Sequence, residues 1–230
     1  KVFCSRCLGF EACRWNGDII GDDFVELLAP HVSYITACPE KEIGLGVPRD
    51  PIRITARDEN ARLEQLNTGR DVTAEMNNYC TDYLESLDEV DGFILKDRSP
   101  SCGFKDVKIY RDLQKGAPVR KGNGFFADAV LAQFPYAAVE TEGRLKNFTI
   151  REHFLTKLFT LGRFRAKRKE GTVGALVQFH AENKFLLMAY NQKEMKKMGQ
   201  ITANTGKDSP DALFSQYEKH LHTAFRKPAT

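Results

Sequence analysis

Three cysteines in this 230-residue chain stand in turn-forming contexts that the other three cysteines lack. Cys7 precedes Leu-Gly, Cys38 precedes Pro-Glu, and Cys102 lies between Pro100-Ser101 and Gly103. Thiolates bind zinc and iron–sulfur clusters, and nearby Gly and Pro allow tight turns that aim backbone N–H groups at sulfur. The pattern therefore predicts a metal centre on Cys7, Cys38 and Cys102.

Three thiolates are compatible with more than one kind of centre. A structural zinc site needs four closed ligands, and no histidine stands beside these motifs. A catalytic zinc ion on three sulfurs is conceivable, and a [4Fe–4S] cluster on three cysteines leaves one iron open to a substrate atom. The simplest alternative is that the thiols are buried and inert. We interpret Cys4, Cys13 and Cys80 in that way, as packing residues.

The cellular compartment is indicated by the same cysteines. Their irregular spacing, with none after Cys102, argues against a disulfide scaffold and predicts a reducing, cytoplasmic location. No apolar run approaches the roughly 18 residues that span a bilayer, and the start does not resemble a signal peptide, so we expect no membrane partner. Because Lys1 lies inside a strand-like run, we expect a few native residues to precede it.

The first part of the chain alternates strand-like and helix-like segments, which predicts an α/β domain with a Rossmann-like parallel sheet and helices on both faces. In such a sheet the carboxyl ends of the strands meet at one edge, where ligands bind. Each of the three cysteines follows a strand, so we expect them to meet in one crevice. The expected strands cover residues 2–4, 31–37, 92–95 and 137–140. A short helix is expected to begin at Phe24, and two longer ones are expected over residues 74–87 and 124–134.

From about residue 149 the pattern changes to three or four helical stretches without a strand. We therefore expect a smaller all-α domain over residues 148–230 after the α/β domain of residues 1–147. Helices are expected over 150–169 and 172–190, and a third one opens at Pro210 after the cap Ser209. We interpret His180, which lies among apolar neighbours, as a core histidine.

Charge is divided unevenly between the two parts. Residues 151–230 hold 15 Lys/Arg and 7 Asp/Glu, a net charge of +8, and the remaining residues carry a net charge of −5. A basic module on an acidic one predicts a polyanionic partner. The candidate contacts to RNA phosphates are at the end of one helix: Arg163, Arg165, Lys167 and Arg168. The alternative is a solvated helix end whose cations are favoured by the helix dipole.

The motifs around the three cysteines resemble those of the thiouracil desulfidases of the TudS type. The resemblance covers about 145 residues and rests on residues 5–9 with 14–17, 38–40 with 44–49, 68–73, 96–103 and 122–126. The rest, with residues 176–181 and 184–189, resembles the YbgA-type helical domain, and we expect it to be incomplete at its C-terminus. The fused architecture is the RudS type, which is linked to removing sulfur from 4-thiouridine in tRNA.

The resemblance implies a [4Fe–4S] cluster on Cys7, Cys38 and Cys102, with the fourth iron free to take the substrate's sulfur. It also implies that Glu40 and Ser99 serve catalysis. At position 16 this sequence has Asn where many members of the family have Asp. This difference weakens any role for a carboxylate at that position, but it does not affect the cysteine ligands.

The expected reaction is a hydrolysis without net redox change. Water attacks C4 of a 4-thiopyrimidine, Glu40 moves the proton and Ser99 supports the developing charge, which gives uracil or uridine and sulfide. We expect Ser101, Arg49 and Lys96 to contact the substrate, with a surface salt bridge as the alternative for either cation. The substrate is thiolated tRNA or a free thio-nucleobase or nucleoside. The competing hypothesis is a non-catalytic iron–sulfur or zinc sensor whose helical domain binds a partner.

Overall fold

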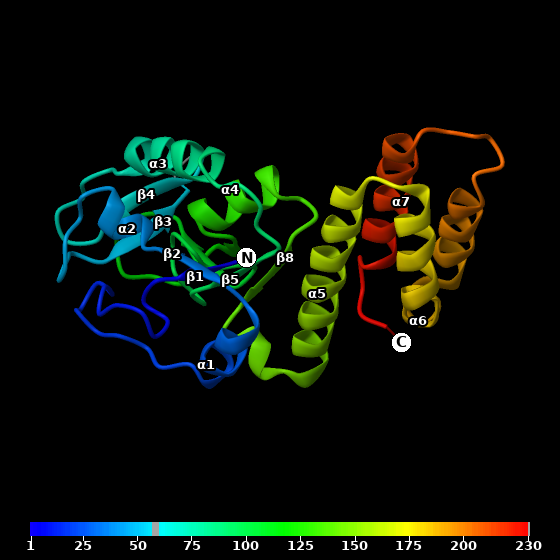
Figure 1. Ribbon diagram of the computed structural model, residues 1–230. Coiled ribbons are helices and arrows are strands. Elements are labelled where there is room, and N and C mark those ends of the chain that lie inside the picture. The colour runs from blue at the N-terminus through cyan, green and yellow to red at the C-terminus, as the bar shows by residue number, and fades with distance from the viewer. Residues whose placement is uncertain (57–59, 230) are drawn as a thin grey trace. The chain divides into compact units, whose positions relative to one another are not determined.

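The computed structural model describes residues 1–56 and 60–229, and the chain divides into two units, Lys1–Lys146 and Asn147–Thr230 (Figure 1). Within the described residues, no helix combines the length and the apolar character that crossing a membrane would require. The first unit carries all of the strands found in these residues, and the second is helical.

The central sheet of the first unit has four parallel strands in the order β2-β1-β5-β8. Every residue of β1 and β5 is buried, as expected for inner strands of a parallel sheet that is covered on both faces. The predicted α/β fold with a parallel sheet is therefore confirmed. The strands are β1 Val2–Ser5, β2 Tyr34–Ala37, β5 Gly92–Leu95 and β8 Ala138–Thr141.

Helices lie on both sides of this sheet, with α3 and α4 on one side and α1 on the other (Figure 1). Helix α3 buries Met76, Cys80 and Leu84, which repeat at a spacing of four residues along one face. On β1, Phe3 packs its ring 5.1 Å from that of Phe126 of α4. The helices are α1 Asp23–Leu28, α2 Pro39–Glu42, α3 Thr73–Glu85 and α4 Phe125–Gln133, with short 3₁₀ turns η1 Ala29–His31 and η2 Arg144–Lys146.

A second sheet, in the order β4-β3-β6-β7, was not predicted from the sequence. Its strands have only three or four residues, too few for a recognisable alternation of apolar and polar residues. On its inner face Ile54, Val107 and Ile109 join the core of the central sheet. The strands are β3 Ile52–Thr55, β4 Arg62–Gln65, β6 Val107–Tyr110 and β7 Arg120–Gly122.

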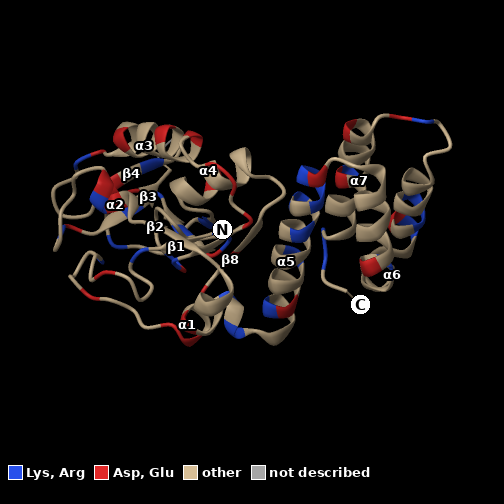
Figure 2. Cartoon of the chain, viewed as in Figure 1, with Lys and Arg blue, Asp and Glu red and all other residues tan. Residues whose placement is uncertain are grey.

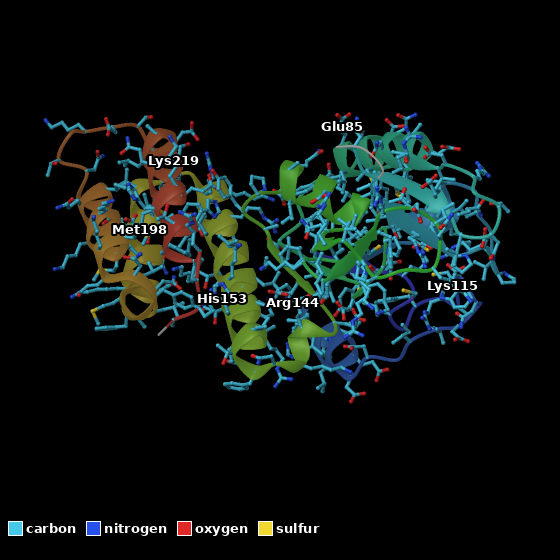
Figure 3. All side chains as sticks on the ribbon, turned by 180° about the vertical axis from the view of Figure 1, so that it is seen from behind. Glu85, Lys115, Arg144, His153, Met198 and Lys219 are labelled. Atoms are coloured by element: carbon cyan, nitrogen blue, oxygen red, sulfur yellow. The ribbon has the colours of Figure 1, made fainter. Side chains whose placement is uncertain are left out.

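The second unit is built from three helices, α5 Phe148–Glu170, α6 Val173–Ala203 and α7 Pro210–Ala224, which confirms the predicted all-helical region. Ser209 caps α7 and accepts from the Ala212 N–H, as expected. Helix α6 runs past residue 190 because Met195 and Met198 continue its buried face. Met198 is labelled in Figure 3. Asn191 interrupts it with φ −162° and ψ 97°.

The core of this unit is aromatic. Phe164 of α5, Phe179 of α6 and Tyr217 of α7 pack their rings 5.2–5.8 Å apart. The hydroxyl of Tyr217 also lies 3.0 Å from Nδ1 of His180. His180 therefore has a polar partner at the edge of the core, which agrees with its interpretation as a structural residue.

Candidate active site

The three predicted cysteines come together at the carboxyl ends of neighbouring strands. Cys7 lies in the turn after β1, Cys38 directly follows β2 at the cap position of α2, and Cys102 lies in the turn region after β5. Because β2, β1 and β5 are adjacent in the sheet, these turns meet at one edge. All three side chains line a single cavity of about 350 Å³.

Burial dominates the electrostatics of these thiols. It raises the pKa of Cys7 to about 12, with the neighbouring Cys38 adding to the shift and Lys96 opposing it. Burial also raises the pKa of Cys102, although a hydrogen bond with Ser5 acts in the opposite direction. A metal group that binds these sulfurs as thiolates must therefore displace protons from them.

Cys13, interpreted from the sequence as a packing residue, is a fourth thiol that lines the same cavity. The Cys38 thiol donates to the backbone carbonyl of Cys13 at 3.7 Å. Burial, followed by Cys38, raises the pKa of the Cys13 thiol to about 12. Its position was missed because it lies far along the loop between β1 and α1, with no Gly or Pro within three residues to mark a turn. The remaining two cysteines, Cys4 in β1 and Cys80 in α3, do not line the cavity.

Glu40 stands in the first turn of α2 and faces two sets of donors. Its Oε1 accepts from the hydroxyls of Ser101 at 2.7 Å and Ser99 at 3.2 Å. Its Oε2 accepts from Nε and Nη2 of Arg49 at 2.9 and 2.7 Å. The Glu40 and Arg49 side chains are 11% and 3% exposed. The carboxylate is therefore held by a buried, charge-assisted pair of hydrogen bonds on one oxygen, with hydroxyls on the other.

Ser99 also shapes the turn that carries Cys102. Its Oγ accepts from the backbone N–H groups of Ser101 and Cys102, both at 3.2 Å. The turn packs closely on the start of α4, where a Cβ on Gly124 would lie 2.4 Å from the Ser101 carbonyl oxygen. Only glycine fits at that position without a backbone shift. Ser99 and the turn that carries Cys102 are thus one structural element.

Arg49 and Lys96, predicted to contact substrate, both line the cavity but have partners within the protein. Besides binding Glu40, Arg49 donates through Nη1 to the carbonyls of Cys13 and Gly46, each at 3.0 Å, and its Nη2 lies 4.0 Å from the sulfur of Cys38. Lys96 forms an ion pair with Glu142 and donates to the Asp97 carbonyl at 3.0 Å. Neither cation forms the simple surface salt bridge that was the alternative.

The cavity wall also includes residues that were not predicted as site residues. Trp15 is 45% exposed, and its carbonyl accepts from the Arg49 N–H at 2.7 Å, which ties its loop to the site. Arg14 and Arg98 line the same wall. Their signal in the sequence is adjacency to the cysteine motifs at 14–17 and 96–103. An exposed indole and two cations at the wall suit a planar ring that carries anionic groups.

The basic residues at the end of α5 are visible as blue segments in Figure 2. Lys167 and Arg168 form ion pairs and hydrogen bonds with other residues of the second unit. Arg168 pairs with Glu218 at 2.6 Å and reaches Asp211 at 3.4 Å. Lys167 donates to Gln178 at 3.1 Å and pairs with Glu170 at 2.8 Å. Their predicted contact with RNA thus competes with bonds that hold the helices together.

Comparisons with known proteins agree with this geometry. The sequence profile of a family described as 2-thiouracil desulfurase matches residues 2–142, and that of DUF1722, described as a protein of unknown function, matches residues 184–230. The uncharacterized protein YbbK of Bacillus subtilis (strain 168) is 31% identical over 145 residues, which are 60% of this chain and 93% of YbbK.

A solved structure of the [4Fe-4S]-dependent thiouracil desulfidase TudS is also similar. It has a TM-score of 0.51 and 27% identity, and the match covers 64% of this chain and 93% of that one. The resemblance stated from the sequence motifs, to thiouracil desulfidases in the first part and to the YbgA type in the second, is confirmed.

Proposed function

This chain belongs to the 2-thiouracil desulfurase family, and from that membership we propose that it is a desulfidase that removes sulfur from a thiopyrimidine with the help of a [4Fe–4S] cluster. The observation that carries the proposal is the meeting of three buried thiols and the Glu40 hydrogen-bond network in one cavity.

The donor set fits a cluster better than it fits a single metal ion. Among residues 1–56 and 60–229, no three His, Cys, Asp or Glu side chains are grouped closely enough to hold one ion. A cluster of four irons is wider than one ion, so its ligand sulfurs stand farther apart around it. Three thiols that line one cavity of about 350 Å³ are consistent with that need. This favours Cys7, Cys38 and Cys102 as the ligands over a zinc site.

A bound cluster with one open iron supplies a Lewis acid for the substrate's sulfur. The protein's own part centres on Glu40. Arg49 fixes Oε2, which leaves Oε1 directed at the hydroxyls of Ser99 and Ser101. Oε1 is placed to take a proton from an attacking water, directly or through Ser101. Ser99, whose oxygen already accepts from two backbone N–H groups, keeps its hydroxyl proton for Glu40, for Ser101 or for a developing anion.

The net reaction is a hydrolysis. A C=S group and water become a C=O group and sulfide, so no electrons are gained or lost. We propose 4-thiouridine in tRNA as the main substrate and free thiouracil or 4-thiouridine as the simpler alternative. The basic charge of residues 151–230 supports a tRNA partner.

The test is sulfide release by the anaerobically reconstituted protein. We expect sulfide and the oxygenated pyrimidine in equal amounts from 4-thiouracil, 4-thiouridine or thiolated tRNA. A ranking by kcat/KM identifies the preferred substrate. A protein that holds a cluster but consumes none of the three would instead be the non-catalytic sensor.

A further inference from the structure

Three cations form a row across the second sheet, outside the site described above. The parallel register pairs Ile54 of β3 with Ile109 of β6, which places Arg53 beside Lys108. Lys108 is in turn the direct partner of Lys121 on β7. Since residues on a strand alternate between faces and Ile54 and Ile109 lie in the core, the row stands on the opposite, outer face.

Two lysines directly opposite each other on neighbouring strands destabilise a sheet unless an anion lies between them. Lys121 has one acidic partner, Asp106, at 3.1 Å. For Lys108, no carboxylate within 4.0 Å of its amine is found among the described residues. Within the part of the chain that the structure describes, the lysine pair therefore carries more positive charge than its acidic partner balances, and an anionic ligand would reduce this repulsion.

Arg53 is fixed in place beside this pair. Its guanidinium stacks on the ring of Tyr110, 4.1 Å from the ring centre, and its Nη1 donates to the carbonyls of Leu113 and Gln114 at 3.3 and 3.1 Å. These are neutral partners, so the positive charge of Arg53 is not cancelled by them. Strands lie about 4.8 Å apart, so the row spans roughly 10 Å.

The row lines a groove of about 640 Å³ that shares a wall with the cysteine cavity. Arg53, Lys108, Tyr110 and Lys121 line the groove, and Pro51, Ile52 and Arg98 line both hollows. A ligand that places a ring in the cavity can therefore extend past Arg98 into the groove.

We propose that this groove binds the phosphate groups of the substrate while the thiopyrimidine enters the cysteine cavity. The inference rests on the proposed desulfidase function and adds to it the surface that holds the substrate's phosphates, whether these belong to a nucleotide or to an RNA strand. Lysine and arginine contacts to phosphates position a nucleic acid without reading its sequence. The groove is a better candidate than the end of α5, where Arg168 already pairs with Glu218.

The first test measures binding of unthiolated tRNA to the cluster-loaded full chain over a range of salt concentrations. Removing two phosphate contacts with Lys108→Ala/Lys121→Ala should lower the slope of log K against log salt by about 1.4–1.8. At about 0.1 M salt, slopes of 0.7–0.9 per phosphate correspond to a loss of roughly 25–60-fold in affinity. Lys108→Arg/Lys121→Arg should retain binding.

A matched control removes two cations elsewhere. Arg62→Ala/Arg70→Ala causes the same change in net charge, but these side chains lie near Asp71 and Glu75 on the edge formed by β4 and the following turn. We expect less than a threefold change in tRNA affinity, because screened surface charges outside the contact contribute little.

The second test compares turnover on three substrates. The double alanine variant should keep its kcat/KM on free 4-thiouracil. An increase in KM on both 4-thiouridine monophosphate and thiolated tRNA means that the groove binds the nucleotide's own phosphate, and an increase on tRNA alone means that it binds the neighbouring strand. An equal loss on free 4-thiouracil, or unchanged tRNA binding and unchanged KM on both phosphorylated substrates, would overturn the proposal.

Failure of the desulfidase function itself would look different. The wild-type protein would then release no sulfide from any substrate, whereas the salt dependence of tRNA binding would still report on the groove.

Discussion

Glu40→Gln is the substitution that separates the proton-transfer role of this residue from its structural role. The amide keeps the size and shape of the side chain, and a rotated amide can still accept from Arg49 and donate to Ser101. What it loses is the ability to take a proton. A general acid–base residue contributes about 10²–10⁴ in rate, so kcat should fall by that factor. At about 1.36 kcal/mol per tenfold, this corresponds to roughly 3–5 kcal/mol of transition-state stabilisation.

The same change also removes a charge from a buried ion pair, and the assay must separate the two effects. Leaving a buried charge without its partner costs about 3–5 kcal/mol of stability. Because the Glu40 and Arg49 side chains are only 11% and 3% exposed, this stability cost applies in full to the buried pair. The hydrogen bonds that the amide of Gln keeps then offset part of that cost. Turnover is therefore normalised to the cluster absorbance of each preparation, and unfolding in urea is measured alongside.

Glu42→Gln provides the matched control on the same helix. The Glu42 carboxylate is 36% exposed and pairs with Arg6 at 2.8 Å. An exposed pair of this kind contributes at most about 1 kcal/mol. Glu42 itself does not line the cavity, although its partner Arg6 does. We expect less than a twofold change in kcat for this variant. If Glu40→Gln with a full cluster turns over as fast as Glu42→Gln, the assignment of Glu40 as the proton acceptor is wrong.

Two further predictions concern packing and pH. Gly124→Ala should lower both stability and cluster retention, because its Cβ would lie 2.4 Å from the Ser101 carbonyl oxygen and push on the turn of Cys102; a urea midpoint equal to that of the wild type would contradict this. Burial, followed by Lys184, lowers the pKa of His180 below the ordinary 6.5, so the unfolded chain takes up a proton before the folded chain does. Stability of the second unit should therefore decline as pH falls below about 6.5, seen as faster hydrogen exchange in α6 and α7, and His180→Gln should reduce that decline. An unchanged pH dependence in the variant would refute the role of His180.

The parts of the site that the sequence predicted are those that local signals determine. Cys7, Cys38 and Cys102 each come after an apolar strand and have Gly or Pro within two residues. Sequence order alone therefore places them at one edge of a parallel sheet. The strands themselves were predictable because buried parallel strands are continuous apolar runs. The cap at Ser209 was predictable because it depends only on the next few residues.

The parts that were missed depend on contacts between distant residues. Arg49 was expected to bind substrate, and only the fold shows that Glu40 occupies two of its donors. Cys13 enters the cavity through a loop whose course no local pattern determines. Strands β6 and β7 have four and three residues, and their pairing, which aligns Lys108 with Lys121, is set by the hairpin rather than by a sequence period.

The ligand assignment is the central claim, and iron content after anaerobic reconstitution tests it most directly. Cys7→Ser, Cys38→Ser and Cys102→Ser should each lose most of their iron and acid-labile sulfide, because each removes one of only three ligands. Cys13→Ser, with Cys80→Ser as a buried control, should retain about four irons per chain, as a [4Fe–4S] cluster requires. Loss of the cluster from Cys13→Ser to the same extent would instead mean that four thiolates close the cluster, and retention in any of the first three variants would remove that cysteine from the ligand set.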